Sequence, residues 1–545
     1  MSPSTSSSLL EFLNQYSKAR SSDVLVINDE TSIDYEPTAY CQLLREKNPM
    51  IWFKKLRGFE DFSIVTNVLG SEERMAFALG CRTEQLYDCW DRVLTHSGKI
   101  SVYSRRNPPV KQRVFEGKDV DLFSLPAAKH YLRDGANSGN GRYITSGLVV
   151  SRNPLDHEII NMSFTRIQVI DKTRYAFDMG SRSHFWRYVQ IATETESRLP
   201  ISVIVGAHPI YYMLAAAFIE NEYEKAARVV GSEYTTGQSN DIPIPTEAEI
   251  VIEAEVLPHA HYDEGPFSEF TGYMARRSTG NVAEVRSILR KDRAIFYDIS
   301  PSNSNEHVGL FSMPRNAAIM RTIREFIPSV PDHKIEWPRS ASHFMVMCSL
   351  DRPAPGLAKE VGLALLALDP LFSKIVIVNA GVESDLSLER LLCNLAVEGA
   401  ARGANVDIIS DVFCIKLDPS SDPSGTNGKM IILTKSSSIP YSKIFQDEDT
   451  VRILAGDSSV VLSHRYTAEG TVNVILDKDI DLRNPNEVLW ALSTRLRPDR
   501  DVTFEDNGKI IFRATKEGLE IPILPEEVLK SVKERIRKTQ SLVNT

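Results

Sequence analysis

The 545-residue sequence lacks several patterns that mark common classes of protein. Its six cysteines form no CxxC pair and no set with zinc-ligand spacing, so neither a zinc site nor a disulfide framework is indicated. The motifs GxSxG and HExxH are absent, which removes two large classes of hydrolase. The glycine-containing stretches GSEYTTG and SGNGRYITSG match neither the GxxxxGKS/T nor the GxGxxG phosphate-binding pattern.

An excess of positive charge and long apolar runs are also missing. The net charge of −9 creates no global field that would recruit nucleic acid. The polar start MSPSTSSS lacks the apolar core of a signal peptide, and the apolar run YYMLAAAFI (211–219) is too short to cross a bilayer. Scattered free thiols suit a reducing compartment. We therefore expect a cytoplasmic protein that binds neither nucleic acid nor a membrane.

The composition that is present, 42% hydrophobic and 25% charged, is that of a globular protein. The chain is too long for one hydrophobic core. Up to about residue 100 helix and strand patterns alternate, which predicts an α/β region. Between 140 and 310 short runs with alternating apolar residues predict half-buried strands, interrupted by one helix at 210–230. These strands are expected at 143–151, 158–170, 200–207, 249–257 and 282–290.

The remainder of the chain reads as a second α/β region. A helical stretch near 315 predicts a connection between domains, and the runs 372–381 and 472–477 predict strands. The stretch 417–429 is rich in Pro, Ser and Gly, which predicts an exposed loop, and a charged helix is expected from Pro525. We predict four parts: an N-terminal α/β region (1–115), a central β domain (116–312), a linker helix (313–335) and a C-terminal α/β domain (336–545).

The stretch DEGPFSEFTGY (263–273) carries two carboxylates, Glu264 and Glu269, on either side of Gly265-Pro266. Gly-Pro excludes a helix, so the two acids are expected on a stiff loop. Taken alone, such a loop is most simply a solvated turn. Arg166 is a charge within the strand-like run NMSFTRIQVI. It must reach solvent or pair with a carboxylate, because burying it alone is costly.

His184 in SRSHFWRY and Glu222 in ENEYEKAARVVG are further candidates. Taken alone, a single His is usually a packed or surface residue, and Glu222 suits the solvated face of a charged helix. Each residue by itself indicates only a multi-domain protein with α/β and β regions.

The order of these motifs is more informative. GRYITSG, N-x-S-x-x-R, a His, E-x-x-x-A ahead of a glycine, PTEAEIVIEAEV and EGPFSEFTGY follow one another, and VILDKDIDLRNPNEVLWALSTRLRPDRD lies at 474–501. This series resembles the UbiD family of decarboxylases that use prenylated FMN, from about residue 40 to 310 and again in the C-terminal segment. The resemblance implies an α+β fold with a central split β-barrel that binds the flavin and a C-terminal domain that forms oligomers.

The resemblance also implies roles for particular residues. The family's catalytic residues fall on Arg166, Glu264 and Glu269, with Glu264 ionised beside Arg166 and Glu269 as the proton donor. The metal ligands fall on Asn161, His184 and Glu222, where oxygen and nitrogen donors suit Mn²⁺ or Mg²⁺. The resemblance further implies a K⁺ ion near this metal. It also implies that the flavin is bound by Asn161, Ser163, Arg166, His184 and Glu222.

The implied reaction is a reversible, non-oxidative decarboxylation of an aromatic or α,β-unsaturated acid, with a coenzyme A thioester as one alternative substrate. The implied partners are a flavin prenyltransferase that supplies the cofactor and further copies of the chain in a homodimer or homohexamer. Two other functions stay open: an oxidoreductase with ordinary FMN on the same fold, and an inactive assembly subunit.

The sequence departs from the family pattern at three places. Ser268 stands where the family usually has Gly before the second Glu, and Thr246 follows Pro245 where Ala is usual. Residues 380–470 look longer than in short family members. Because Ser restricts the backbone and adds a hydroxyl, we expect the loop that carries the acids to be set slightly differently.

Overall fold

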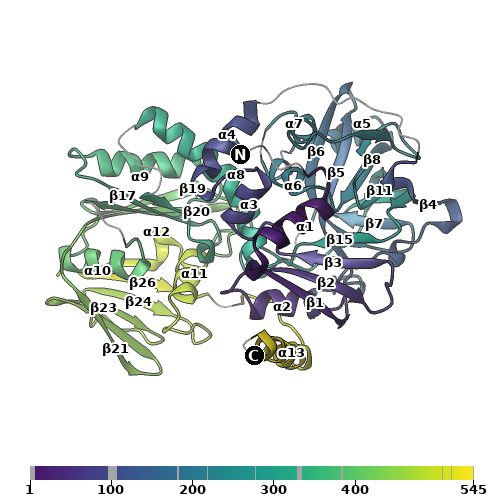
Figure 1. Ribbon diagram of the computed structural model, residues 1–545. Coiled ribbons are helices and arrows are strands. Elements are labelled where there is room, and N and C mark those ends of the chain that lie inside the picture. Colours follow the sequence, from purple (N-terminus) through teal and green to yellow (C-terminus); the bar gives the residue numbers. More distant parts are fainter. Residues whose placement is uncertain are drawn as a thin grey trace. The chain divides into compact units, whose positions relative to one another are not determined.

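The structure is a computed structural model that describes residues 6–95, 107–180, 183–217, 219–275, 278–327, 334–381, 385–505, 507–516 and 518–543. The chain divides into two compact units, labelled by their elements in Figure 1. Unit 1 consists of Met1–Phe270, Met274–Arg315 and Ile521–Thr545, and unit 2 of Thr271–Tyr273 and Asn316–Glu520.

Unit 1 contains most of the predicted N-terminal and central elements. Its helices are α1 (Leu9–Ala19), α2 (Glu36–Leu43), α3 (Glu72–Ala78), α4 (Leu86–Thr95), α5 (His184–Glu194), α6 (Pro209–Ala215), α7 (Glu222–Val230) and α13 (Glu526–Val543). Its strands are β1 (Val24–Thr31), β2 (Met50–Leu56), β3 (Phe62–Thr66), β4 (Arg113–Glu116), β5 (Tyr143–Asn153), β6 (Asp156–Val169), β7 (Arg174–Phe177), β8 (Leu199–Val205), β9 (Tyr234–Thr236), β10 (Pro243–Pro245), β11 (Ile250–His261), β12 (Phe267–Ser268), β13 (Met274–Ala275), β14 (Asn281–Arg290) and β15 (Ala294–Asp298).

Two sheets form the frame of unit 1. The first has the order β1-β2-β3-β15, in which β15 joins β3 in parallel and so ties the end of the central region to the N-terminal sheet. The second has the order β11-β8-β5-β6-β7-β14-β4, and its paired strands run antiparallel. Because β14 also pairs with β11, hydrogen bonds connect β11, β8, β5, β6, β7 and β14 in a circuit. The five strands expected between 140 and 310 are confirmed as β5, β6, β8, β11 and β14.

Helix α8 (Asn305–Phe326) continues from unit 1 into unit 2. The other helices of unit 2 are α9 (Leu357–Leu368), α10 (Leu388–Glu398), α11 (Pro485–Arg495) and α12 (Pro498–Asp501). Its strands are β16 (Ile335–Glu336), β17 (Met345–Leu350), β18 (Ile375–Ala380), β19 (Val406–Phe413), β20 (Thr426–Lys435), β21 (Tyr441–Asp447), β22 (Thr450–Ala455), β23 (Ser458–Ser463), β24 (Val472–Leu476), β25 (Val502–Phe504) and β26 (Ile510–Ala514).

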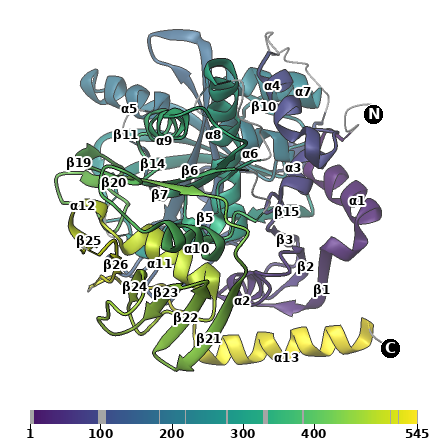
Figure 2. The same ribbon diagram turned by 90° about the vertical axis from the view of Figure 1, so that its left-hand side faces the viewer.

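Unit 2 also contains two sheets, with the orders β16-β17-β18-β20-β19 and β21-β22-β23-β24-β26-β25. Alternate residues of the first sheet enter two different cores. Ile375 and Ile377 pack with α10 and the second sheet, whereas Val376 and Val378 pack with α9. Figure 2 shows α10 beside strands of the second sheet. The α/β character predicted for this region is confirmed, because β17, β18 and β20 run parallel with helices between them.

Three local expectations are wrong. The single helix expected at 210–230 is two helices, α6 and α7, because Asn221 has a left-handed backbone (φ 57°) immediately before α7. The helix expected from about 315 begins earlier, at Asn305. The stretch 417–429 is not simply an exposed loop: Asp418 and Ser420 are buried because they accept hydrogen bonds from the buried Lys374 ammonium group at 3.2 and 2.7 Å.

The C-terminal segment differs from the predicted domain boundary. Ile521–Thr545 groups with unit 1, although the sequence suggested that it belongs to a domain spanning 336–545. The charged helix expected from Pro525 is confirmed as α13, and Figure 1 shows it beside α2. Arg535 on α13 forms an ion pair with Glu36 at 2.7 Å, and Val532 is fully buried in the core of unit 1. The other predicted boundaries stay predictions.

In the part of the chain that the structure describes, every helix is too short or too polar to cross a bilayer.

Candidate functional site

Strand β6 carries the central residue of the site, Arg166. In the pairing of β5 with β6, Ile144 stands opposite Ile167 and Gly147 opposite Thr165. Two residues of β5 between these pairs therefore face the single residue Arg166 of β6. Such a β-bulge bends the strand locally and re-aims side chains, and bulges are common beside active sites. One of the two bulge residues, Thr145, is fixed by a hydrogen bond, in which its Oγ accepts from the Ile299 amide at 2.9 Å. Arg166 is thus presented from a locally fixed backbone.

Arg166 is almost buried and is surrounded by carboxylates. Its side chain is 13% exposed, and its guanidinium forks onto Glu264, with Nε–Oε1 at 3.2 Å and Nη2–Oε2 at 3.0 Å. Nη1 donates to Glu269 Oε1. Nη2 also lies 3.6 Å from Asp178 Oδ2. We call Arg166, Glu264, Glu269 and Asp178 the acid cluster. The solvated alternative for Arg166 is therefore wrong, because its charge is paired inside unit 1.

The loop that carries the two acids, residues 262–270, is called the acid loop. It begins after β11 and contains the two-residue strand β12. Gln168, two positions beyond Arg166 on the same face of β6, accepts a hydrogen bond from the Gly265 amide at 3.0 Å. The carbonyls of Gly265 and Pro266 accept hydrogen bonds from the Asn137 and Gly135 amides at 3.0 and 2.9 Å. The Gly-Pro spacer is thus fixed at both peptide groups.

The two acids have unlike electrostatic environments. Burial would raise the pKa of Glu264, but the Arg166 guanidinium outweighs it and holds the pKa below its usual range. Burial raises the pKa of Glu269, and the negative charges of Asp178 and Glu264 add to this effect, against the opposing influence of Arg166. These directions agree with the expectation of one ionised and one neutral carboxyl.

A second group lies on the same strand, and we call Asn161 and Glu222 the carboxylate–amide pair. Glu222 opens α7 and is buried, and its Oε1 accepts from the Met162 amide at 2.6 Å. With its amide nitrogen toward Glu222, Asn161 would donate to Oε1 at 3.1 Å. In the other orientation Asn161 donates to Ser163 Oγ at 2.8 Å, and two oxygens face each other.

The carboxylate–amide pair fits a cation chemically. Burial raises the pKa of Glu222 to about 7, against the opposing effect of the hydrogen bond from Met162. A divalent cation between an amide oxygen and a carboxylate would compensate both groups. Among the described residues no three His, Cys, Asp or Glu side chains gather as a metal site.

His184 is not brought to this pair. It is the first residue of α5, its side chain is exposed, and no hydrogen bond or ion pair joins it to Asn161 or Glu222 in the described ranges. Residues 181–182, which precede it, lie outside those ranges. The metal-ligand role of His184 therefore stays a prediction.

Several residues of the site were not foreseen from the sequence. Gln168 could have been found from the sequence, because a residue two positions after Arg166 on a strand lies on the same face. Asp178 and the buried Tyr143 have none. Phe267 lies within the acid loop and contacts Arg166, with the guanidinium carbon 5.1 Å from its ring centre. Ser268 is fully buried, and its hydroxyl has no hydrogen-bond partner among the residues that the structure describes.

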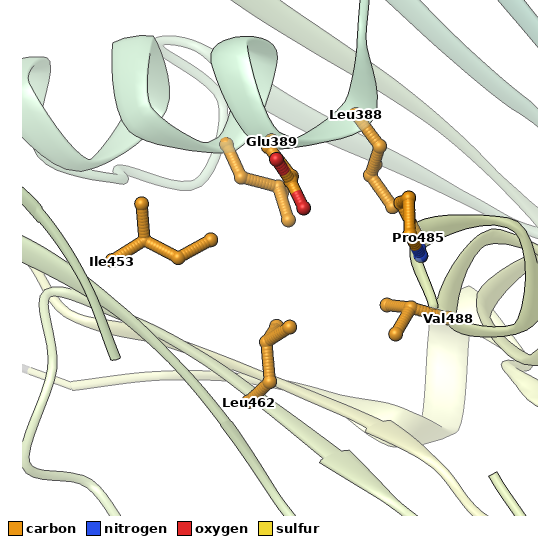
Figure 3. Close-up of a pocket in the computed structure, with 7 residues that line it drawn as sticks. Leu388, Glu389, Ile453, Leu462, Pro485 and Val488 are labelled. Atoms are coloured by element: carbon orange, nitrogen blue, oxygen red, sulfur yellow. The ribbon is translucent and has the colours of Figure 1, made fainter. Parts of the chain in front are cut away.

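A pocket in unit 2 is separate from these groups. Figure 3 shows it between α10, strands β22 and β23, and α11. It is lined by apolar side chains and by Glu389, which pairs with Lys443 at 2.5 Å. None of the predicted site residues lines it, so the candidate site stays with β6 and the acid loop. The lining residues are Leu388, Glu389, Leu392, Ile453, Leu462, Pro485 and Val488.

Comparison with known proteins identifies the class of the chain. Three family models described as domains of 3-octaprenyl-4-hydroxybenzoate carboxy-lyase match it: the N-terminal domain at 17–92, the Rift-related domain at 101–304, and the C-terminal domain at 309–434 and 459–513. The fold and the matches thus define a carboxy-lyase. The chain belongs to the UbiD family. Residues 435–458, between the matched parts, contain β21 and β22.

Individual relatives are distant. The chain is 26% identical to a phenolic acid decarboxylase of Streptomyces sp. over 71% of its length and 83% of that protein. It is 27% identical to an anhydromevalonate phosphate decarboxylase of Methanothermobacter thermautotrophicus, over 75% and 93% of the two chains. The UbiD-class enzyme HmfF from Pelotomaculum thermopropionicum, solved with FMN, has a TM-score of 0.71 at 24% identity, covering 79% and 94%. That structural likeness establishes the mixed α/β fold.

Proposed function

We propose that this protein is a prenylated-FMN-dependent decarboxylase of an aromatic or α,β-unsaturated carboxylic acid. The observation that carries the proposal is the acid cluster, in which one nearly buried arginine pairs with two carboxyls whose pKa values are shifted in opposite directions. The name of the phenolic acid decarboxylase relative favours a phenolic acid as the first substrate to test. The phosphorylated substrate named for the archaeal relative supports testing non-aromatic unsaturated acids as well.

The two groups on β6 would hold opposite ends of the cofactor. Asn161 and Arg166 are five residues apart, so their backbones are separated by about 16 Å along the strand. Asn161, Glu222 and His184 would bind Mn²⁺ or Mg²⁺ against the phosphate, with K⁺ nearby, and Ser163 would contact the same end. The circuit of strands β11, β8, β5, β6, β7 and β14 would be the split β-barrel. When bound, prenylated FMN would supply the electron sink that decarboxylation requires.

The residues of the chain perform the remaining steps. Arg166 orients the substrate carboxylate, since its planar guanidinium matches a carboxylate in two hydrogen bonds. Glu264 stays ionised and keeps Arg166 in place. Glu269, held neutral by burial, donates a proton to the carbon that has lost CO₂. Because the step reverses, the same Glu269 would remove that proton during carboxylation.

Two alternatives predict different observations. An oxidoreductase would bind ordinary FMN, and an inactive assembly subunit would bind cofactor without releasing CO₂. The intact acid cluster favours the decarboxylase, since an inactive subunit does not require these groups to be kept.

The deciding experiment is expression with and without a flavin prenyltransferase. We expect the prenylated-flavin absorbance only after co-expression, together with CO₂ release from a panel of phenolic and acrylic acids. Substrate hydrogen–deuterium exchange would report the proton step separately. Bound prenylated flavin without CO₂ release or exchange on any acid would refute the proposal. The same samples, analysed by gel filtration, would show whether the chain forms the expected dimer or hexamer.

A further inference from the structure

The two acids of the acid loop both lie in unit 1, but the chain on either side of each is held differently. Glu264 adjoins Gly265, whose amide and carbonyl are bonded to Gln168 and Asn137 within unit 1. Glu269 is followed after one residue by Thr271–Tyr273, a segment that groups with unit 2, whereas Phe270 and Met274 on either side group with unit 1. The chain therefore enters unit 2 for three residues, one residue after Glu269.

Trp490 on α11 holds this segment. Its indole Nε1 donates to the Thr271 carbonyl at 2.8 Å. Its ring stacks on Tyr273 with centroids 5.0 Å apart and an interplanar angle of 19°. A side chain at Gly272 would come within 3.0 Å of the indole, and Gly272 has φ +86°. Both the close approach of the indole and the left-handed backbone therefore favour glycine at this position.

Arg495, one turn and a little further along α11, completes the attachment. Its Nε donates to the Tyr273 hydroxyl at 2.9 Å. Its Nη1 and Nη2 form ion pairs with Asp477 and Asp479 at 2.5 and 2.6 Å. Arg495 is nearly buried and fixed by two carboxylates, so the Tyr273 hydroxyl is bound to a rigid group.

We propose that Trp490 is a positioning residue for Glu269, and that it acts by holding Thr271 and Tyr273 in unit 2. This inference rests on the proposed role of Glu269 as the proton donor. Arg166, Glu264 and Glu269 all belong to unit 1, and Phe270 joins Glu269 to the segment that Trp490 holds. The attachment thus gives Glu269 an anchor along the chain that Glu264 does not share.

The test compares two conservative variants with a matched control. Trp490→Phe keeps an aromatic ring but loses the donor to Thr271, and Tyr273→Phe loses only the hydroxyl bound to Arg495. The control Trp52→Phe also loses an indole hydrogen bond, from Nε1 to Ser63 Oγ at 3.2 Å in the N-terminal sheet. All are prepared as holoenzymes from co-expression with a flavin prenyltransferase, and flavin content and melting temperature are measured first.

We expect Trp490→Phe to lower kcat by about ten- to a hundredfold with KM changed less than about twofold, because small misplacements of a catalytic group have effects of this size. The pH dependence of kcat should change as well, since Glu269 is held differently. Tyr273→Phe should have a smaller effect of the same kind. Trp52→Phe should leave kcat unchanged.

The decisive comparison uses the Glu269→Gln background. If Trp490 acts through Glu269, Trp490→Phe has no further effect on the residual rate of Glu269→Gln. An equal effect in both backgrounds, or a loss of kcat that merely follows loss of flavin or stability, would overturn the inference. An active Glu269→Gln would instead refute the proposed function. An inactive Glu269→Gln beside fully active Trp490→Phe and Tyr273→Phe would refute this inference alone.

Discussion

The acid cluster and the carboxylate–amide pair each take one residue from strand β6, Arg166 and Asn161, but differ in how their charges are balanced. In the acid cluster, the positive charge of Arg166 is paired with the carboxylate of Glu264. The same guanidinium also forms ion pairs with Glu269 and Asp178. In the pair, Glu222 is buried beside Asn161, and burial raises its pKa to about 7.

The difference indicates two kinds of function on one strand. A cluster that contains its own cation can hold one carboxyl ionised and another neutral, which suits proton transfer. A buried carboxylate beside an amide oxygen offers oxygen donors to a cation, which suits metal binding. The following experiments test this distinction, from the largest expected effect to the smallest.

Glu269→Gln should remove the proton donor and keep the shape of the side chain. We expect kcat to fall by about 10²- to 10⁴-fold, the usual contribution of one general acid. Flavin content should be unchanged, because Glu269 is not in the carboxylate–amide pair. CO₂ release by the purified holoenzyme checks this. Normal turnover would show that Glu269 is not the donor.

Glu222→Gln should act on the other group. We expect the affinity for Mn²⁺ to fall by more than about a hundredfold, since even outer partners of metal ligands contribute about ten- to a hundredfold. At about 100 times Kd, Mn²⁺ should stabilise the unmodified protein by about 2.7 kcal/mol, and this gain should be lost in the variant. Thermal unfolding and flavin content on gel filtration are the measurements. The exposed neighbour Glu220→Gln is the control, and a variant that keeps both metal and flavin would exclude Glu222 from the site.

His184→Ala tests a residue that the structure leaves outside the pair. We expect a weaker effect on Mn²⁺ affinity than that of Glu222→Gln, of about tenfold, because the exposed imidazole must move to reach the metal. The same Mn²⁺ titration followed by thermal unfolding measures it. An unchanged affinity would mean that Asn161 and Glu222 bind the ion without His184.

Asp178→Asn should alter only the pH dependence. A proton donor works in its protonated form, so kcat is lost as pH rises through the pKa of Glu269. Asp178 helps to raise that pKa, and neutralising it should move the alkaline limb of the profile to lower pH. Arg166 and Glu264 remain in the variant. A limb that stays in place, or moves to higher pH, would contradict this assignment.

Ser268→Ala should have the smallest effect. The hydroxyl is buried without a partner, so its removal should leave stability unchanged or raise it by about 1 kcal/mol. We expect kcat and KM within about twofold of the original values. Thermal unfolding and steady-state kinetics would reveal a larger change, and a raised KM would instead assign the hydroxyl to substrate binding.

Much of the fold was predictable because hydrophobic periodicity reports burial directly. The alternating runs in the central region became β5, β6, β8, β11 and β14, and the run 372–381 became β18. The errors came from single residues with unusual surroundings. Asn221 divides a helix through a left-handed backbone, and Lys374 draws part of a polar loop into the interior. Neither effect has a periodic signal.

The candidate site was predictable to a different degree in its two groups. The order of the motifs pointed to Arg166, Glu264 and Glu269, and the structure brings these three together. It also brings Asn161 to Glu222 but leaves His184 exposed. Asp178 was not found, because it comes from a separate segment after β7 and only pairing of the strands places it beside Arg166.

The sequence by itself determined the class of the chain, through the order of its motifs, and the stiffness of DEGPFSEFTGY, through Gly265-Pro266. The tertiary structure alone decided that the acids are buried rather than solvated, and that the pKa of Glu264 is lowered while the pKa of Glu269 is raised. The physical reason is that a pKa depends on burial and on neighbouring charges, which come from distant segments. The attachment of Thr271–Tyr273 to Trp490 is of the same kind, since it joins residues more than two hundred positions apart.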